Sequence, residues 1–221
     1  MNRTHTTTSR AAFAAAGLAA LPGAHAAAGA ISGFTWSSGI ASVAGVTIVP
    51  PVDPNNDNAV GPSLNELVIT QKDYTVPGPV DIVFFVEPTG GVTEYTILEG
   101  VNNGTGLDFI EYRMVLGFGT GSGFVQSTDL DGLDFDTPDE DLPPNFSTFF
   151  PTVSLASEDV LVATGGVFPD GAFSLPPFAF AIDVPDGIAE FTLRQIPRPV
   201  PEPASAALLG VALLFARRRR S

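Results

Sequence analysis

Residues 109–116, FIEYRMVL, carry the clearest structural pattern in this 221-residue chain. Apolar side chains at positions 110, 112, 114 and 116 alternate with charged side chains at positions 111 and 113. A period of two places alternate side chains on opposite faces of a β-strand. The stretch therefore predicts a strand with one buried face.

Two pairs of such stretches are separated by short turn signals. Residues 92–101 are strand-like, and the sequence NNGTG at 102–106 separates them from the strand at 109–116. Residues 178–184 and 189–194 also alternate, with Pro-Asp-Gly at 185–187 between them. Asn, Asp, Gly and Pro are the usual residues of tight turns. We therefore predict two β-hairpins, one over 92–117 and one over 178–194.

The rest of the body has the composition of an all-β protein. Phenylalanine, glycine and proline are frequent, with 17, 23 and 20 residues. Further strands are predicted at 42–49, 64–71, 81–86, 148–155 and 159–163, and turn-rich breaks at 50–62, 117–123 and 128–145. Many short strands joined by turns are typical of sandwiches. The sequence predicts a single antiparallel β-sandwich or jelly-roll domain over residues 27–196.

The C-terminus has three parts in a fixed order: Val200-Pro201-Glu202-Pro203, an apolar run over 204–216, and Arg217-Arg218-Arg219-Arg220. As a helix the apolar run would span roughly 20 Å, less than a hydrocarbon core of about 30 Å. Consecutive arginines resist translocation and should stay cytoplasmic. The prolines keep Glu202 on an extended peptide, which suits a protease. A plain C-terminal membrane anchor is the alternative.

This tail, residues 200–221, resembles the PEP-CTERM sorting domain of Gram-negative bacteria. The resemblance implies that an exosortase-type membrane protease recognises the Pro-Glu-Pro motif and removes the helix and the arginine tail. The protein would then touch the inner membrane transiently through 204–216 before it reaches the cell surface. Residues 197–203 are the proline-rich linker that joins the body to this signal, and 204–221 form the short hydrophobic helix and basic tail.

The N-terminal sequence is typical of a secretory signal peptide over residues 1–26. Arg3 and Arg10 form its basic region, a moderately apolar helix follows over 11–21, and Ala24 and Ala26 are the small residues of a cleavage site. Signal peptidase and the secretion machinery are therefore expected partners.

Removing both ends changes the chemistry that the body can perform. Both histidines fall in the signal peptide and the chain has no cysteine, which excludes Ser-His-Asp and Cys-His catalysis and ordinary zinc or haem sites. The body keeps four basic and all 24 acidic residues, a net charge of −20. Such a surface repels nucleic acid and attracts cations.

The body also resembles a group of secreted bacterial β-sandwich proteins with interchangeable anchors, the choice-of-anchor group. The resemblance rests on residues 93–117, including Thr93-Glu94-Tyr95 and the turn at 102–106. It implies an extracellular sandwich and brings no catalytic residues.

Two sets of carboxylates are candidate sites. Asp129, Asp131, Asp134 and Asp136 are candidate calcium ligands, because hard cations take several oxygens from a flexible loop. A solvated acidic loop is the alternative. Glycoside hydrolysis needs only two carboxylates, and three glutamates lie on strands, Glu94, Glu99 and Glu111. Charged residues that alternate with apolar ones usually face solvent, so we expect these three on the surface.

These observations predict an exported, non-enzymatic protein of the cell surface or extracellular matrix. Its role would be structural or adhesive, in an exopolysaccharide or biofilm layer, without a cofactor. The alternative is a carbohydrate- or calcium-binding extracellular module.

Overall fold

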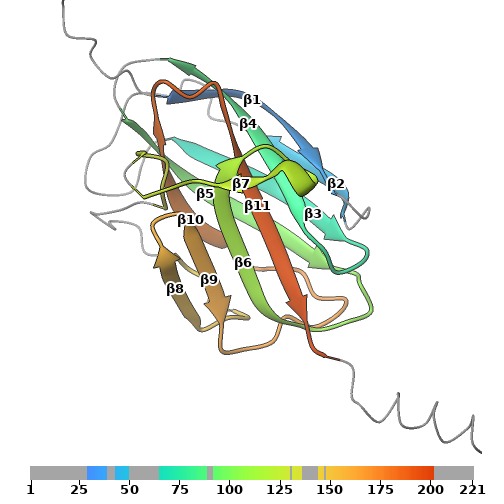
Figure 1. Ribbon diagram of the computed structural model, residues 1–221. Helices are drawn as coiled ribbons and strands as arrows, with labels where there is room; N and C mark the ends of the chain where they lie inside the picture. The colour runs from blue at the N-terminus through green and yellow to red at the C-terminus, as the bar shows by residue number, and fades with distance from the viewer. Residues whose placement is uncertain are drawn as a thin grey trace, which may run out of the picture.

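Two β-sheets face each other in the computed structural model (Figure 1), which describes residues 29–38, 43–49, 65–88, 92–129, 131–135, 144–146 and 148–201. The first sheet has the order β1-β4-β11-β6-β9-β8, with β7 paired to β6, and the second the order β10-β5-β3-β2. The strands are β1 (Gly29–Ser37), β2 (Val43–Val49), β3 (Glu66–Tyr74), β4 (Val80–Pro88), β5 (Val92–Asn103), β6 (Phe109–Phe118), β7 (Val125–Gln126), β8 (Thr152–Ser157), β9 (Val160–Thr164), β10 (Phe178–Pro185) and β11 (Glu190–Pro199). A 3-10 turn, η1 (Gly121–Gly123), precedes β7. The all-β sandwich expected from the sequence is confirmed.

Among the described strands, pairing is antiparallel with one exception. Strands β3 and β5, neighbours in the second sheet, run parallel. The strand β1 was not predicted from the sequence, and it pairs with β4 at the edge of the first sheet.

Both predicted hairpins are wrong. Strand β5 pairs with β10 and β3, whereas β6 pairs with β11, β9 and β7, so 92–117 crosses from one sheet to the other. Strands β10 and β11 likewise lie in different sheets. At the first crossing the side chain of Asn103 donates to the carbonyl oxygens of Leu107 at 2.9 Å and Phe168 at 3.1 Å. These bonds fix the chain where it crosses from one sheet to the other. A turn signal in the sequence does not show whether the next strand pairs with the previous one or enters the facing sheet.

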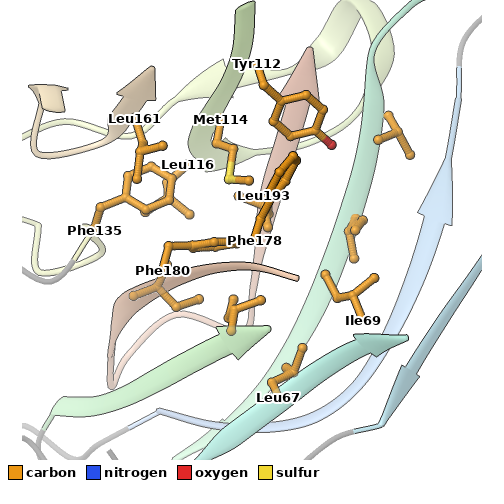
Figure 2. Packing of buried hydrophobic residues seen from close by; sticks show 14 of the residues in the cluster. Leu67, Ile69, Tyr112, Met114, Leu116, Phe135, Leu161, Phe178, Phe180 and Leu193 are labelled. Atoms are coloured by element: carbon orange, nitrogen blue, oxygen red, sulfur yellow. The ribbon is translucent and has the colours of Figure 1, made fainter. Parts of the chain in front are cut away.

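The inward faces of the two sheets form one hydrophobic core (Figure 2). Leu67 and Ile69 approach from β3, and Leu193 approaches from β11. Phe178 of β10 lies in an aromatic cluster, with its ring 4.4 Å from Phe146, 5.5 Å from Tyr112, 5.9 Å from Phe168 and 6.2 Å from Phe150. Burying a side chain of this size contributes about 1.5–3 kcal/mol.

A β-bulge in β3 changes which side chains of the strand point into the core. Ile69 pairs with Glu99 of β5, but the next recorded pair is Lys72 with Val101, so β3 has one extra residue. Leu67 and Ile69 point inward before the bulge, and Lys72 is fully buried after it. A bulge reverses the alternation because it inserts one unpaired residue.

Gly100 allows the close approach that this bulge needs. A Cβ atom at Gly100 would lie 2.6 Å from the backbone oxygen of Thr70, within the bulge, and 2.9 Å from the ring of Phe173. The bulge is therefore matched by a glycine on the neighbouring strand.

Candidate functional site

The body ends where the predicted sorting signal begins. Strand β11 continues through Pro197 and Pro199, which pair with Tyr112 and Phe109 of β6. The backbone N–H of Val200 then donates to the carbonyl oxygen of Asp108 at 2.8 Å. Pro201 follows and is exposed. The strand thus covers part of the predicted linker, and within the described residues Val200 is the last one that bonds to the sheet through its backbone.

An exposed ion pair lies beside this junction. Arg198 Nη1 is 3.2 Å from Glu111 Oε2, across the β11–β6 pair. Because the arginine side chain is 62% exposed, the pair contributes at most about 1 kcal/mol. The carboxylate of Glu111 is therefore paired with Arg198 of the neighbouring strand at the junction.

In the predicted calcium segment, Asp131 bonds to its own loop. Its Oδ2 accepts from Ser127 Oγ at 2.6 Å and from the N–H of Thr128 at 3.2 Å, and its Oδ1 accepts from the N–H of Leu133 at 3.0 Å. Asp134 forms a backbone bridge to Asp183 of β10. Such bonding is typical of an aspartate turn.

Three of the four candidate ligands, Asp129, Asp131 and Asp134, lie within the described residues. Asp136 lies outside the described residues. Within the part of the chain that the structure describes, no group of three or more Asp, Glu, His or Cys is placed to hold a metal ion. Calcium binding stays a prediction.

Asp159, which the sequence did not single out, lies near this acidic segment. It is 1% exposed and immediately precedes β9. Burial, and then the negative charges of Asp131, Asp129 and Asp134, raise the pKa of Asp159 to about 6, against a smaller opposing effect of a hydrogen bond with Ser127. Asp159 is therefore protonated in mildly acidic solution.

We expect Asp159→Asn to stabilise the protein at pH 7.5 and to have little effect at pH 4. The folded-state pKa of about 6 exceeds the usual value of about 3.9, so the stability linked to the protonated acid is lost as pH rises through 6. After allowance for solvent screening, the gain should be on the order of 1 kcal/mol. Urea unfolding at both pH values in a chelating buffer measures it, and Glu66→Gln, an exposed acid at the start of β3, is the control. An equal gain at both pH values would contradict the assignment.

The three strand glutamates are not gathered on a solvent face. Glu94 is 2% exposed and Glu99 is 0% exposed, whereas Glu111 pairs with Arg198. The expectation that all three lie on the surface is wrong for Glu94 and Glu99. Trp36 is the single tryptophan of the chain and the natural candidate for stacking on a sugar. Its side chain is partly buried and packs against the core.

Glu99 belongs to a buried polar network that sequence reasoning missed. It contacts Lys72 of β3, and both side chains are fully buried. Gln195 of β11 and Tyr112 of β6 reach this pair from the opposite sheet. A strict period of two continued from Leu67 and Ile69 would place Lys72 on the outward face, so the sequence did not predict its burial.

The tail matches a known family model. Residues 199–220 match the model described as the PEP-CTERM protein-sorting motif, beginning at the last residue of β11. The chain carries a PEP-CTERM sorting motif. This motif implies export, transient association with the membrane and processing by an exosortase-type membrane enzyme. Searches of curated proteins and of solved structures find no match.

Most of the PEP-CTERM signal lies outside the described residues. The parts of the signal that lie outside are Glu202, Pro203, the apolar segment 204–216 and the cluster Arg217–Arg220. The signal-cleavage residues Ala24 and Ala26 lie outside them as well. Among the residues that are described, no helix is long and apolar enough to cross a membrane.

Proposed function

We propose that the mature protein is a non-enzymatic structural or adhesive component of the cell surface or extracellular matrix of a Gram-negative bacterium, in its exopolysaccharide or biofilm layer. The observation that carries the proposal is the PEP-CTERM motif directly after the last sandwich strand. Only Val200 separates that strand from the Pro-Glu-Pro sequence. Removal of the tail after this strand would therefore release the body next to the membrane.

The state of the strand carboxylates supports a role without catalysis. Hydrolysis of a glycosidic bond needs two carboxylates that flank the substrate. Glu94 and Glu99 are buried, and Glu111 pairs with Arg198. A strongly acidic surface also keeps an exported protein soluble until it is incorporated.

Fractionation of the producing cells tests this proposal. The mature protein, without its signal peptide and its sorting tail, should be recovered from the surface and matrix fractions. Deleting the gene should weaken biofilm cohesion without reducing the amount of polysaccharide. A cytoplasmic protein with both ends intact, or an unchanged biofilm, would contradict it.

A calcium- or carbohydrate-binding module is the second candidate. Its support is the negative field of Asp129, Asp131 and Asp134 at Asp159, which a bound cation would relieve. Calorimetric titration with Ca²⁺ should then give heat that Asp131→Asn abolishes, and a glycan array tests carbohydrate retention. No heat and no retained glycan would favour the structural role.

A further inference from the structure

Lys72 is the only lysine of the chain, and it lies in the core of the sandwich. Its Nζ atom is 5.5 Å from the ring centre of Tyr74 and 5.3 Å from that of Tyr112. It contacts Oε1 of Glu99, and neither of these two side chains is exposed. The bulge in β3 and the glycine that faces it place the amine at this position.

A chain of hydrogen bonds ends on the other carboxyl oxygen of Glu99, Oε2. Gln195 Nε2 donates to Glu99 Oε2 at 2.8 Å. Tyr112 donates its hydroxyl to Gln195 Oε1 at 3.1 Å, and the hydroxyl of Tyr74 is 3.3 Å from that of Tyr112. Burial raises the pKa of both tyrosines, which keeps these hydroxyls protonated and able to donate. The carboxyl group is therefore polarised at Oε2, while Oε1 faces the amine.

A simple buried ion pair would be poorly satisfied here. An ammonium group has three donors, and a buried charge needs hydrogen-bonded partners. Within the described residues neither Lys72 Nζ nor Glu99 Oε1 has a partner with hydrogen-bond geometry, although the two atoms touch. Burial also lowers the pKa of Lys72 well below its usual value, which favours the neutral amine. A neutral, desolvated lysine amine is a nucleophile.

We propose that Lys72 and Glu99 condense into an intramolecular isopeptide bond. The lone pair of Nζ attacks Cδ of the protonated carboxyl group, and the Nζ–Cδ bond forms. Gln195 Nε2 stabilises the negative charge that develops on Oε2. The Cδ–Oε1 bond then breaks, and Oε1 leaves as water with the proton of the acid and one proton of the amine. The reaction needs no oxidant, cofactor or second protein, because fixed proximity replaces a collision.

The bond would tie β3 to β5, the parallel pair inside the second sheet. Such a link constrains the unfolded chain as a disulfide does, and the chain has no cysteine. It replaces a buried amine and a buried carboxyl group with one neutral amide that has a single N–H donor. The inference does not depend on the proposed surface role, because the bond forms from residues of the body alone.

Mass spectrometry and amine counting on the purified, fully denatured protein test the proposal. The intact mass should be about 18 Da below the mass of the same chain without the bond, because one water is lost. An amine-reactive acylating reagent should then add one group, at the N-terminus, because the single lysine is consumed. Cleavage between the two strands should give a branched peptide that joins Lys72 to Glu99. A full mass with two acylated amines would overturn the proposal.

Variants distinguish the bond from other losses of water. Glu99→Gln can react with release of ammonia, so it should fall about 17 Da below its own sequence mass and reach the mass of the wild-type product. Lys72→Met and Glu99→Ala should keep their full masses. Aspartate followed by glycine can also lose water, as at Asp131, Asp170 and Asp186. A loss that persists in Lys72→Met, or that leaves Lys72 reactive in the wild type, would exclude the isopeptide bond.

Discussion

Replacing Glu202 with alanine should slow removal of the C-terminal tail at least about tenfold, so that the protein accumulates with residues 204–221 attached. Glu202 is the only charged residue of the Pro-Glu-Pro sequence, and the prolines on both sides keep it extended. Loss of a charge-assisted contact in a recognition site costs about 1.5–3 kcal/mol, which corresponds to at least about a tenfold loss of processing. Intact mass and cell fractionation measure the effect, with the unprocessed form expected in the inner membrane.

Glu190→Ala provides the matched control. Glu190 is an exposed acid at the other end of the same strand, β11, and its replacement removes the same charge from the body. This variant should be processed and exported like the wild type. Normal processing of Glu202→Ala would show that the match at residues 199–220 does not act as a sorting signal in this chain.

The sorting signal could be predicted because it is linear. Its three parts are recognised by their order along the chain, from Val200 to Arg220, without any folded partner. The family match over 199–220 confirms that interpretation. The structure adds that β11 continues to Pro199, because proline can occupy a strand position where its missing N–H is not needed for pairing.

Most strand positions could also be predicted, with β1 and β7 missed, but the partners of the strands could not. The alternation at 109–116 located β6 correctly. Alternation indicates which side chains are buried. The pattern is the same whether two successive strands pair in a hairpin or lie in facing sheets. The chain crosses between sheets after Asn103 because that side chain bonds to Leu107 and to the distant Phe168. Contacts of that range leave no local signal.

The buried network was missed for a related reason. One extra residue in β3 reverses the facing of every later side chain, so a strict period of two assigns Lys72 to solvent. Glu99 was placed on the surface because charged strand residues usually face solvent, although it lies on the same inward face of β5 as Ile97 and Val101. Tyr112 and Gln195 join the network from the other sheet, a proximity that only the tertiary fold creates.

Phe178→Ala should give the largest loss of stability among single core truncations of the aromatic cluster. The ring of Phe178 is fully enclosed and contacts the rings of Tyr112, Phe146, Phe150 and Phe168. Truncating a buried phenylalanine to alanine costs about 3–5 kcal/mol, because transfer energy is lost and a cavity remains. Since a domain is stable by only about 5–15 kcal/mol, this is a large share of the total. Urea unfolding followed by tryptophan fluorescence of Trp36 measures the change.

Phe85→Ala removes the same atoms from a different environment. Phe85 lies on β4 and is 40% exposed, so its truncation leaves no enclosed cavity and should cost less than about 1.5 kcal/mol. The difference between the two variants therefore measures the packing of the aromatic cluster rather than the general effect of losing a phenyl ring. Equal losses in both would mean that Phe178 is not enclosed by the four rings, and the sandwich core would have to be packed differently in that region.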